Sequence, residues 1–114
     1  MPYFKIETSQ EPDFTVIREL PKKASVFISD LLGKPENWVM ISINYGTEMM
    51  FGGNSKPAAH VELKSIGLSK ENCADLSEAI CNFIEEELRV PATRIYIDFR
   101  NIEKKQFGWN RTTF

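Results

Sequence analysis

The sequence predicts an α+β fold in which two β-α-β repeats form a four-stranded mixed sheet with two helices on one face. Two observations support this prediction. Apolar residues recur at helical spacing in two long segments, and short runs rich in β-branched and aromatic residues flank each segment. The two halves also share one pattern at a constant offset, because a proline follows each helical segment and Pro35 and Pro91 are 56 positions apart.

The first repeat begins with a predicted strand over residues 3–8, followed by a helix and a second strand over residues 39–43. Pro21 lies inside the helical segment. Either the helix is kinked at Pro21, or its regular part begins there with Pro21 as a first-turn residue, and the sequence leaves both possibilities open. The apolar stripe of this helix consists of Val16, Ile17, Leu20, Ala24, Phe27, Ile28 and Leu31.

The second repeat has a predicted strand over residues 59–64, a helix from about Ser69 to Arg89 and a strand over residues 95–99. Ser69 can cap this helix, and the carboxylate of Glu71 suits the positive end of the helix dipole. Core packing explains the apolar stripe without any cofactor. The stripe consists of Cys73, Leu76, Ile80, Phe83, Ile84 and Leu88.

The helical crossovers predict that the two strands of each repeat are parallel. Two such repeats leave one face of the sheet without helices. The segments 39–43 and 95–99 offer apolar side chains in both directions, so this uncovered face is also expected to be apolar. Self-association would cover it and would create pockets between subunits.

Length and composition predict a single domain spanning residues 1–114. The chain has 26% charged residues, a formal net charge of −2 and no basic run, which argues against nucleic acid or a membrane as a partner. Charged residues such as Lys5, Glu7 and Arg18 interrupt the N-terminal segment, and no later segment is long enough to span a bilayer. We therefore expect a cytoplasmic protein, or one secreted without a cleaved signal.

The cysteine and histidine content argues against a disulfide and against a metal site. Cys73 and Cys81 are eight positions apart in one predicted helix, roughly 12 Å, which is too far for a disulfide. We expect both to be reduced thiols, with Cys73 on the core face and Cys81 at its edge. His60 is the only histidine and has no cysteine or carboxylate at ligand spacing.

The N-terminus offers one unusual chemical group. Met1 is normally removed when proline follows, so the mature chain is expected to begin with Pro2, whose nitrogen is a secondary amine. Such an amine, at the end of a strand in an apolar pocket, could accept and donate protons near neutral pH. Taken alone, the same feature is equally compatible with N-terminal processing of a frayed chain end.

Several short motifs, in order and with consistent spacing, resemble one protein family. They are Pro2 before the first strand, Gly33-Lys34-Pro35, Phe51-Gly52-Gly53, Ser65-Ile66-Gly67, Arg94-Ile95-Tyr96-Ile97, Gly108-Trp109-Asn110 and Thr112-Thr113-Phe114. Over essentially its whole length the chain resembles the macrophage migration inhibitory factor (MIF) family of tautomerases, which includes D-dopachrome tautomerase.

The resemblance implies the MIF tautomerase fold and a homotrimer in which three sheets form a central barrel. It also implies an isomerase that tautomerises phenylpyruvate-like aromatic keto acids and dopachrome-like substrates, without a metal or organic cofactor. Some animal members are secreted cytokines. A cytokine-like signalling protein that binds a receptor and merely retains the pocket is therefore the alternative.

The resemblance also implies roles for individual residues. Pro2 would be the general base, and Lys34 would bind the substrate carboxylate. Ile66 would contact the substrate through its backbone, and Tyr96 would come from the neighbouring subunit. The apolar wall for an aromatic substrate would consist of Trp38, Phe107, Trp109 and Phe114, with Tyr3 at the rim.

Three positions depart from the family pattern. Asp98 stands where well-studied members carry an asparagine beside the ligand, and its charge would favour protonated Pro2 unless Arg100, Lys34 or an outward rotamer neutralises it. Residues 58–61 read Ala-Ala-His-Val in place of the Cys-x-x-Cys of some members, so thiol oxidoreductase chemistry has no support. Phe107 is bulkier than the small aliphatic residue common at its site, which predicts a narrower or shifted pocket.

Overall fold

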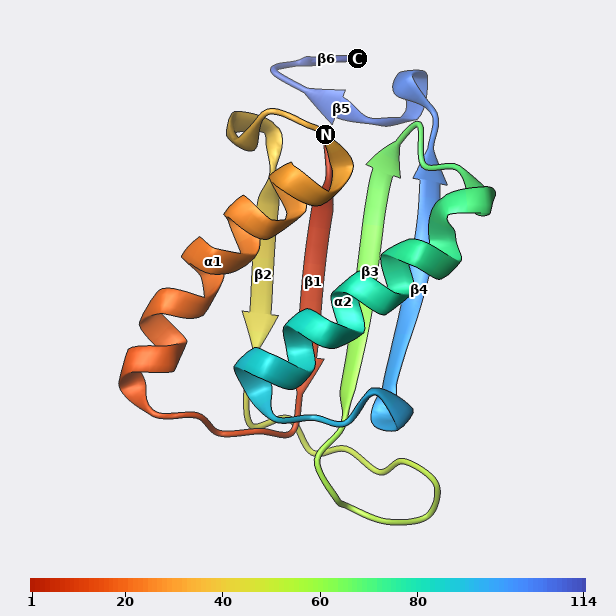
Figure 1. Cartoon of the computed structure of the whole chain (residues 1–114). Helices are drawn as coiled ribbons and strands as arrows, with labels where there is room; N and C mark the ends of the chain where they lie inside the picture. Colours follow the sequence, from red (N-terminus) through yellow and green to blue (C-terminus); the bar gives the residue numbers. More distant parts are fainter.

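The computed structural model describes residues 1–114 and contains one four-stranded sheet, two α-helices and a C-terminal hairpin (Figure 1). The elements in chain order are β1 (Tyr3–Thr8), α1 (Phe14–Leu32), β2 (Met40–Asn44), β3 (Ala59–Ile66), α2 (Cys73–Leu88), β4 (Ile95–Ile102), β5 (Gly108–Trp109) and β6 (Thr112–Thr113).

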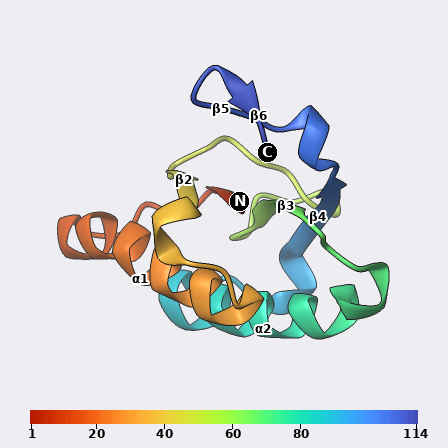
Figure 2. The same ribbon diagram turned by 90° about the horizontal axis from the view of Figure 1, so that it is seen from above.

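The strand order of the sheet is β2-β1-β3-β4, so β1 and β3 are the inner strands. β1 and β2 are parallel, β3 and β4 are parallel, and β1 and β3 are antiparallel. Both helices lie on one side of this mixed sheet, and β5 and β6 lie toward the other side (Figure 2). The predicted fold class and the parallel pairing within each repeat are therefore confirmed.

The predicted repeat of one β-α-β pattern in the two halves of the chain agrees with the positions of their elements. A 3₁₀ turn at Glu36–Trp38 precedes β2, and one at Ala92–Arg94 precedes β4 at the same offset of 56 positions. Each helix ends at a residue in the left-handed conformation, Gly33 after α1 and Arg89 after α2, with φ of 62° and 59°. Both helices thus end with a left-handed C-cap residue, although only α1 has a glycine at this position.

The core lies between the helices and the sheet. Alternate residues of the inner strands, such as Phe4, Ile6, Val61 and Leu63, are fully buried against the apolar stripes of both helices. The two helices also contact one another directly, because the rings of Phe27 and Phe83 stack with centroids 4.3 Å apart.

The structure resolves the alternatives for the first helix. α1 begins at Phe14 and continues through Pro21, so the interpretation in which its regular part starts at Pro21 is wrong. Asp13 stabilises the helix start, because its carboxylate accepts a hydrogen bond from the Val16 amide at 3.1 Å. A well-capped first turn and the buried stripe explain why the helix tolerates a proline that cannot donate a backbone hydrogen bond.

Two predictions about the second helix need correction. Ser69 does not cap it, because a 3₁₀ turn at Lys70–Asn72 precedes α2 and the Ser69 hydroxyl donates to the Glu71 carboxylate instead. The prediction that Cys73 lies on the core face is also wrong, whereas Cys81 lies at the edge of the core as predicted. Cys81 packs against the core, whereas Cys73 is at the start of α2 with its thiol near the Ser69 carbonyl. The later start of the regular helix moves Cys73 away from the core.

The sheet face without helices, here called the open face, is mostly polar, so the prediction of an apolar open face is wrong. The apolar residues of β2 and β4, such as Ile41 and Phe99, pack against the core instead. The intervening positions carry one ion pair on each of three strands. These are Lys5–Glu7 at 3.5 Å, Glu62–Lys64 at 3.8 Å and Asp98–Arg100 at 3.1 Å. The exposed apolar residues of this face are Met40 and Tyr96.

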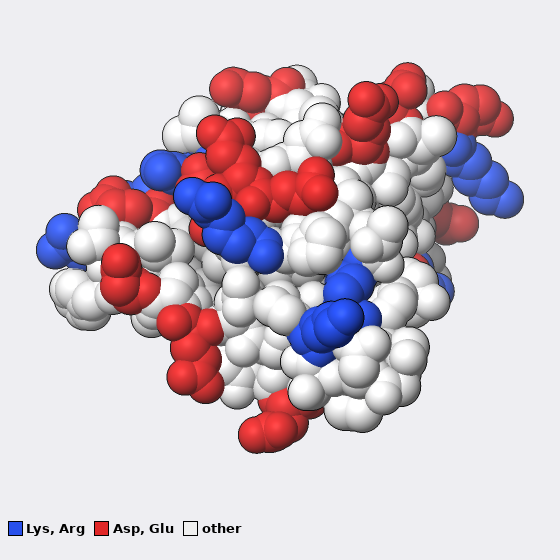
Figure 3. All heavy atoms as spheres, turned by 60° about the horizontal axis from the view of Figure 1, so that its bottom comes forward, with Lys and Arg blue, Asp and Glu red and all other residues white.

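The surface has no continuous basic patch on the face shown in Figure 3, where acidic and basic atoms are interspersed among uncharged ones. No helix has the length and apolar character needed to cross a membrane.

The paired helix ends generate the first prediction. A non-glycine residue in the left-handed region costs about 1 kcal/mol relative to glycine. Gly33 has open space where a Cβ would be added, and Arg89 is exposed, so neither site carries a competing packing effect. We expect Gly33→Ala to lower the free energy of unfolding by about 1 kcal/mol and Arg89→Gly to raise it by about 1 kcal/mol. Urea denaturation of both variants measures this, and changes of the same sign would contradict it.

Candidate active site

Pro2 is held at the start of an inner strand. It directly precedes β1, and its carbonyl accepts a hydrogen bond from the Met40 amide at 2.9 Å, which extends the β1–β2 pairing to the chain end. The Pro2 side chain is less than 2% exposed. A chain end that would ordinarily fray is therefore fixed in the sheet.

Pro2 lines a cavity of about 560 Å³ at the end of the sheet. Met1 and the ends of the strands form one side of this cavity, the strands through Tyr3, Met40, Lys64 and Ile102. The other side comes from the turn before β2 and from the C-terminal segment, through Trp38, Gln106, Phe107, Gly108, Trp109 and Phe114. Figure 1 shows the N-terminus beside the C-terminal hairpin at this end of the molecule.

The four aromatic residues predicted to form the apolar wall do come together. The ring of Trp38 meets Trp109 and Phe114 edge-on, with centroids 4.9 and 5.3 Å apart. Phe114 also contacts Phe107 at 5.8 Å, and its backbone amide donates to the Phe107 carbonyl at 3.2 Å. The cluster joins the chain end to the turn after α1 and closes one side of the cavity.

The terminal amine is in an environment that disfavours its charged form. In the chain that begins with Met1, burial lowers the pKa of this amine below its ordinary value of 8.0, and the charge of Lys34 lowers it further. Neutral amine is therefore available at a lower pH than at a free chain end.

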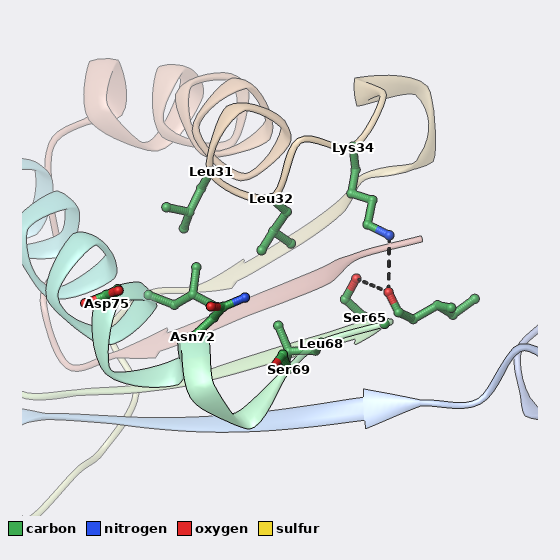
Figure 4. A pocket seen from close by; sticks show the side chains of 11 residues that line it. Leu31, Leu32, Lys34, Ser65, Leu68, Ser69, Asn72 and Asp75 are labelled. Atoms are coloured by element: carbon green, nitrogen blue, oxygen red, sulfur yellow. Dashed lines mark hydrogen bonds between the residues drawn. The ribbon is translucent and has the colours of Figure 1, made fainter.

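Lys34 and Ile66 line a second, adjoining cavity of about 310 Å³ between the end of α1 and the start of α2 (Figure 4). The Lys34 ammonium donates to the Ile66 carbonyl at 3.2 Å, and the buried Ser65 hydroxyl donates to the same oxygen at 3.4 Å. The Lys34 charge therefore lowers the pKa of the terminal amine from an adjoining cavity, and Lys34 does not line the Pro2 cavity itself.

Tyr96 lies at the other end of the sheet from Pro2. It pairs with His60 in the β3–β4 register, whereas Tyr3 pairs with Lys64. Its ring is 65% exposed and contacts the Phe51 ring at 4.8 Å. Within one chain, Tyr96 and Pro2 do not form a common site.

Arg94 fixes the loop on which Tyr96 rests. Its guanidinium lies over the Phe51 ring at 5.0 Å. It donates hydrogen bonds to four loop carbonyls, those of Phe51, Asn54, Lys56 and Pro57, at 2.8 to 3.4 Å. This arginine needs no carboxylate, because the carbonyls satisfy its donors.

Asp98 is paired by Arg100 on the same strand. Three contacts of 3.1, 3.2 and 3.1 Å join the Arg100 guanidinium to both carboxylate oxygens. The pairing raises the pKa of Arg100 through hydrogen bonding and charge. Of the neutralising groups considered from the sequence, Arg100 is the one that contacts Asp98.

The comparisons with known proteins agree on one family. The family model described as macrophage migration inhibitory factor (MIF) matches residues 1–114. The chain belongs to the MIF family. It is 40% identical to a macrophage migration inhibitory factor homolog of Brugia malayi and 37% identical to one of Wuchereria bancrofti, over 100% of this chain and 99% of each relative.

Solved structures of the family share the fold. The macrophage migration inhibitory factor homologue from Prochlorococcus marinus is 39% identical with a TM-score of 0.89, and the alignment covers 98% of both chains. The protein from Trichinella spiralis is 31% identical with a TM-score of 0.90, covering 98% of this chain and 99% of that one. Membership of the MIF family supports a tautomerase or cytokine-like function for this chain.

Sequence reasoning missed Met40, Lys64, Ile102 and Gln106, which line the Pro2 cavity together with Met1. The β1–β3 register would have revealed Lys64, because it lies directly opposite Tyr3. That register follows from an antiparallel pairing between the two repeats, which the offset of 56 positions does not specify.

The arrangement can support acid–base chemistry on an apolar substrate. It combines a terminal amine of lowered pKa, a buried Pro2 side chain, an apolar aromatic wall and two lysines near the chain end. No group of three or more His, Cys, Asp or Glu side chains is placed to hold a metal ion.

The aromatic wall generates the second prediction. Phe114→Ala removes a ring that contacts Trp38, Phe107 and Trp109, so we expect a red-shifted tryptophan emission and a free energy of unfolding lower by about 1–2 kcal/mol. Phe14→Ala is the matched control, because Phe14 is 71% exposed on α1 and contacts neither tryptophan. Equal emission spectra for wild type and Phe114→Ala would contradict the closed wall.

Proposed function

We propose that this chain is a keto–enol tautomerase for phenylpyruvate-like and dopachrome-like aromatic substrates, with the Pro2 amine as general base after removal of Met1. The observation that carries this proposal is the position of Pro2 in a cavity with an aromatic wall, where its side chain is less than 2% exposed in the chain that still begins with Met1. Removal of Met1 would leave the secondary amine of Pro2 as the terminal nitrogen in that cavity.

The proton transfer requires a neutral amine in an enclosed site. The Pro2 nitrogen accepts the proton from the carbon beside the substrate carbonyl, and the carbon–hydrogen electron pair becomes the double bond of the enolate. The protonated amine then returns the proton to the carbonyl oxygen, which gives the enol. Burial and the Lys34 charge, which lower the pKa of the terminal amine in the chain with Met1, would act on Pro2 in the same direction.

Lys34 and the aromatic wall would orient the substrate. A substrate carboxylate can replace the Ile66 carbonyl as the acceptor for the Lys34 ammonium, which gains a charge-assisted hydrogen bond. The same charge would stabilise the enolate as it forms. The rings of Trp38 and Phe114 would hold the aromatic body of the substrate.

A homotrimer would complete the site. Tyr96 is exposed at the far end of the sheet from Pro2, so it can contact the substrate only at the cavity of another copy. Family membership supports an oligomeric assembly. Arg94 lies over the Phe51 ring, and the Phe51 ring contacts the Tyr96 ring. These contacts would orient the Tyr96 ring on the subunit surface before it enters the cavity of the neighbouring subunit.

The third prediction concerns the base. We expect the mature wild type to convert phenylpyruvate between its keto and enol forms, with kcat/KM rising with pH as the amine loses its proton and then reaching a plateau. The midpoint should lie below the pKa of the same amine in the unfolded chain, since the folded environment disfavours the ammonium. Pro2→Gly should lower kcat/KM by about 10²–10⁴-fold.

Two controls accompany this assay. Mass spectrometry establishes that the assayed chain begins at Pro2, and Lys56→Ala, which removes an exposed lysine outside both cavities, should retain full activity. An inert wild type that begins at Pro2 and is trimeric by light scattering would refute the tautomerase proposal for this substrate. The cytokine-like, partner-binding alternative would then be favoured.

The fourth prediction tests whether sites form between subunits. Pro2→Gly and Tyr96→Ala should each be poorly active alone. Each site of a mixed trimer would take Pro2 from one subunit and Tyr96 from another, so refolding the variants together in equal amounts should restore about one quarter of wild-type activity. A mixture no more active than its components would contradict a shared site.

A further inference from the structure

One charged side chain lines the Pro2 cavity, and it is Lys64. All other residues of the lining have apolar or uncharged side chains, and Gln106 also lines the neighbouring hollow on the open face. Lys34, to which the family resemblance assigns the substrate carboxylate, lines the adjoining cavity instead. Apart from the terminal amine, the charge that a ligand meets inside the Pro2 cavity is therefore that of Lys64.

Strand alternation explains why Lys64 faces this cavity. Lys64 lies opposite Tyr3 in the β1–β3 register, next to Pro2. Its neighbour Ser65 is 1% exposed and points toward the helices, so Lys64 points to the open face. The end of β3 thus has cations on both sides, Lys64 on the open face and Lys34 at the Ile66 carbonyl.

Lys64 is available to a ligand because its own ion pair is weak. Its ammonium is 3.8 Å from the Glu62 carboxylate, with 40% and 25% of the two side chains exposed. A pair of this kind contributes little to stability, because water screens the two charges. A carboxylate brought into the apolar cavity would compete well for the ammonium, since fewer waters would screen that contact.

A polar hollow of about 400 Å³ continues from the Pro2 cavity across the open face. The two spaces share Lys64, Ile102 and Gln106. The hollow adds Asn101, the Asp98–Arg100 pair and Glu62, which is the ion-pair partner of Lys64. A substituent that extends beyond the aromatic wall would therefore enter a polar region with an ammonium and an amide as donors, while Asp98 is already neutralised by Arg100.

We propose that Lys64, assisted by Gln106, forms an anion subsite in the Pro2 cavity, so that the preferred substrates are aromatic keto acids with a second carboxylate on the ring. The substrate class rests on the proposed tautomerase function, whereas the anion subsite does not. The keto acid carboxylate would engage Lys34, the ring would lie against the aromatic wall, and the second carboxylate would engage Lys64.

Equilibrium binding tests the subsite without requiring catalysis. Trp38 and Trp109 line the cavity, so quenching of their fluorescence reports occupancy. The probes are phenylacetate and para-carboxyphenylacetate, which differ by one carboxylate. We expect the wild type to bind the dicarboxylate about ten-fold more tightly, with a preference that shrinks as salt screens the charge.

The variants assign this preference to one residue. Lys64→Met keeps an unbranched side chain of nearly the same length without its charge. It should therefore abolish the preference and change phenylacetate binding less than about three-fold, while Lys64→Arg should retain the preference. Lys5→Met is the matched control, because Lys5 is an ion-paired lysine on the same sheet face outside the cavity. Circular dichroism confirms that each variant is folded.

Three outcomes would overturn the proposal. These are equal affinity of the wild type for both probes, a preference that survives in Lys64→Met, and binding of neither probe. Failure of the tautomerase proposal is separately recognisable, because an inert protein that still prefers the dicarboxylate through Lys64 has the subsite without the reaction.

Discussion

The site depends on the fixing of the chain start inside the sheet. β1 pairs with β2 on one side and β3 on the other, and the Met40 amide extends this pairing to the Pro2 carbonyl. The first residues of most chains fray, but here they are buried because their strand is internal. A terminal nitrogen in this place is partly desolvated, which disfavours its positive charge. The C-terminal segment contributes the opposite wall, so both chain ends are needed to enclose one cavity.

The polar open face resolves the difficulty that Asp98 raised. A carboxylate near the site would favour the ammonium form of Pro2, but the Arg100 guanidinium engages both of its oxygens. Ion pairs between residues two positions apart are also present on β1 and β3, where a lysine pairs with a glutamate on the open face. The face is therefore densely charged yet locally neutral, and it differs from the apolar surface expected from the sequence.

The sequence predicted the elements of the fold well because local signals define them. Prolines after the helices, apolar stripes and β-branched runs predicted the four long strands, both helices and the doubling. It did not predict the β5–β6 hairpin, whose turn residues Asn110 and Arg111 both have positive φ. An Asn-Gly pair would have indicated such a turn, whereas an arginine at the second position does not. The aromatic wall was predicted through family resemblance, but Lys64 requires the strand register, which no local pattern specifies.

The pKa of the Pro2 amine in the mature protein is the most direct test of this chemistry. It can be measured by ¹⁵N NMR titration of the folded protein and of the chain unfolded in urea. We expect a lower pKa in the folded state, because burial and the Lys34 charge both disfavour the ammonium, and a partial return toward the unfolded value in Lys34→Gln. A folded-state pKa equal to or above the unfolded value would contradict a buried, neutral proline base.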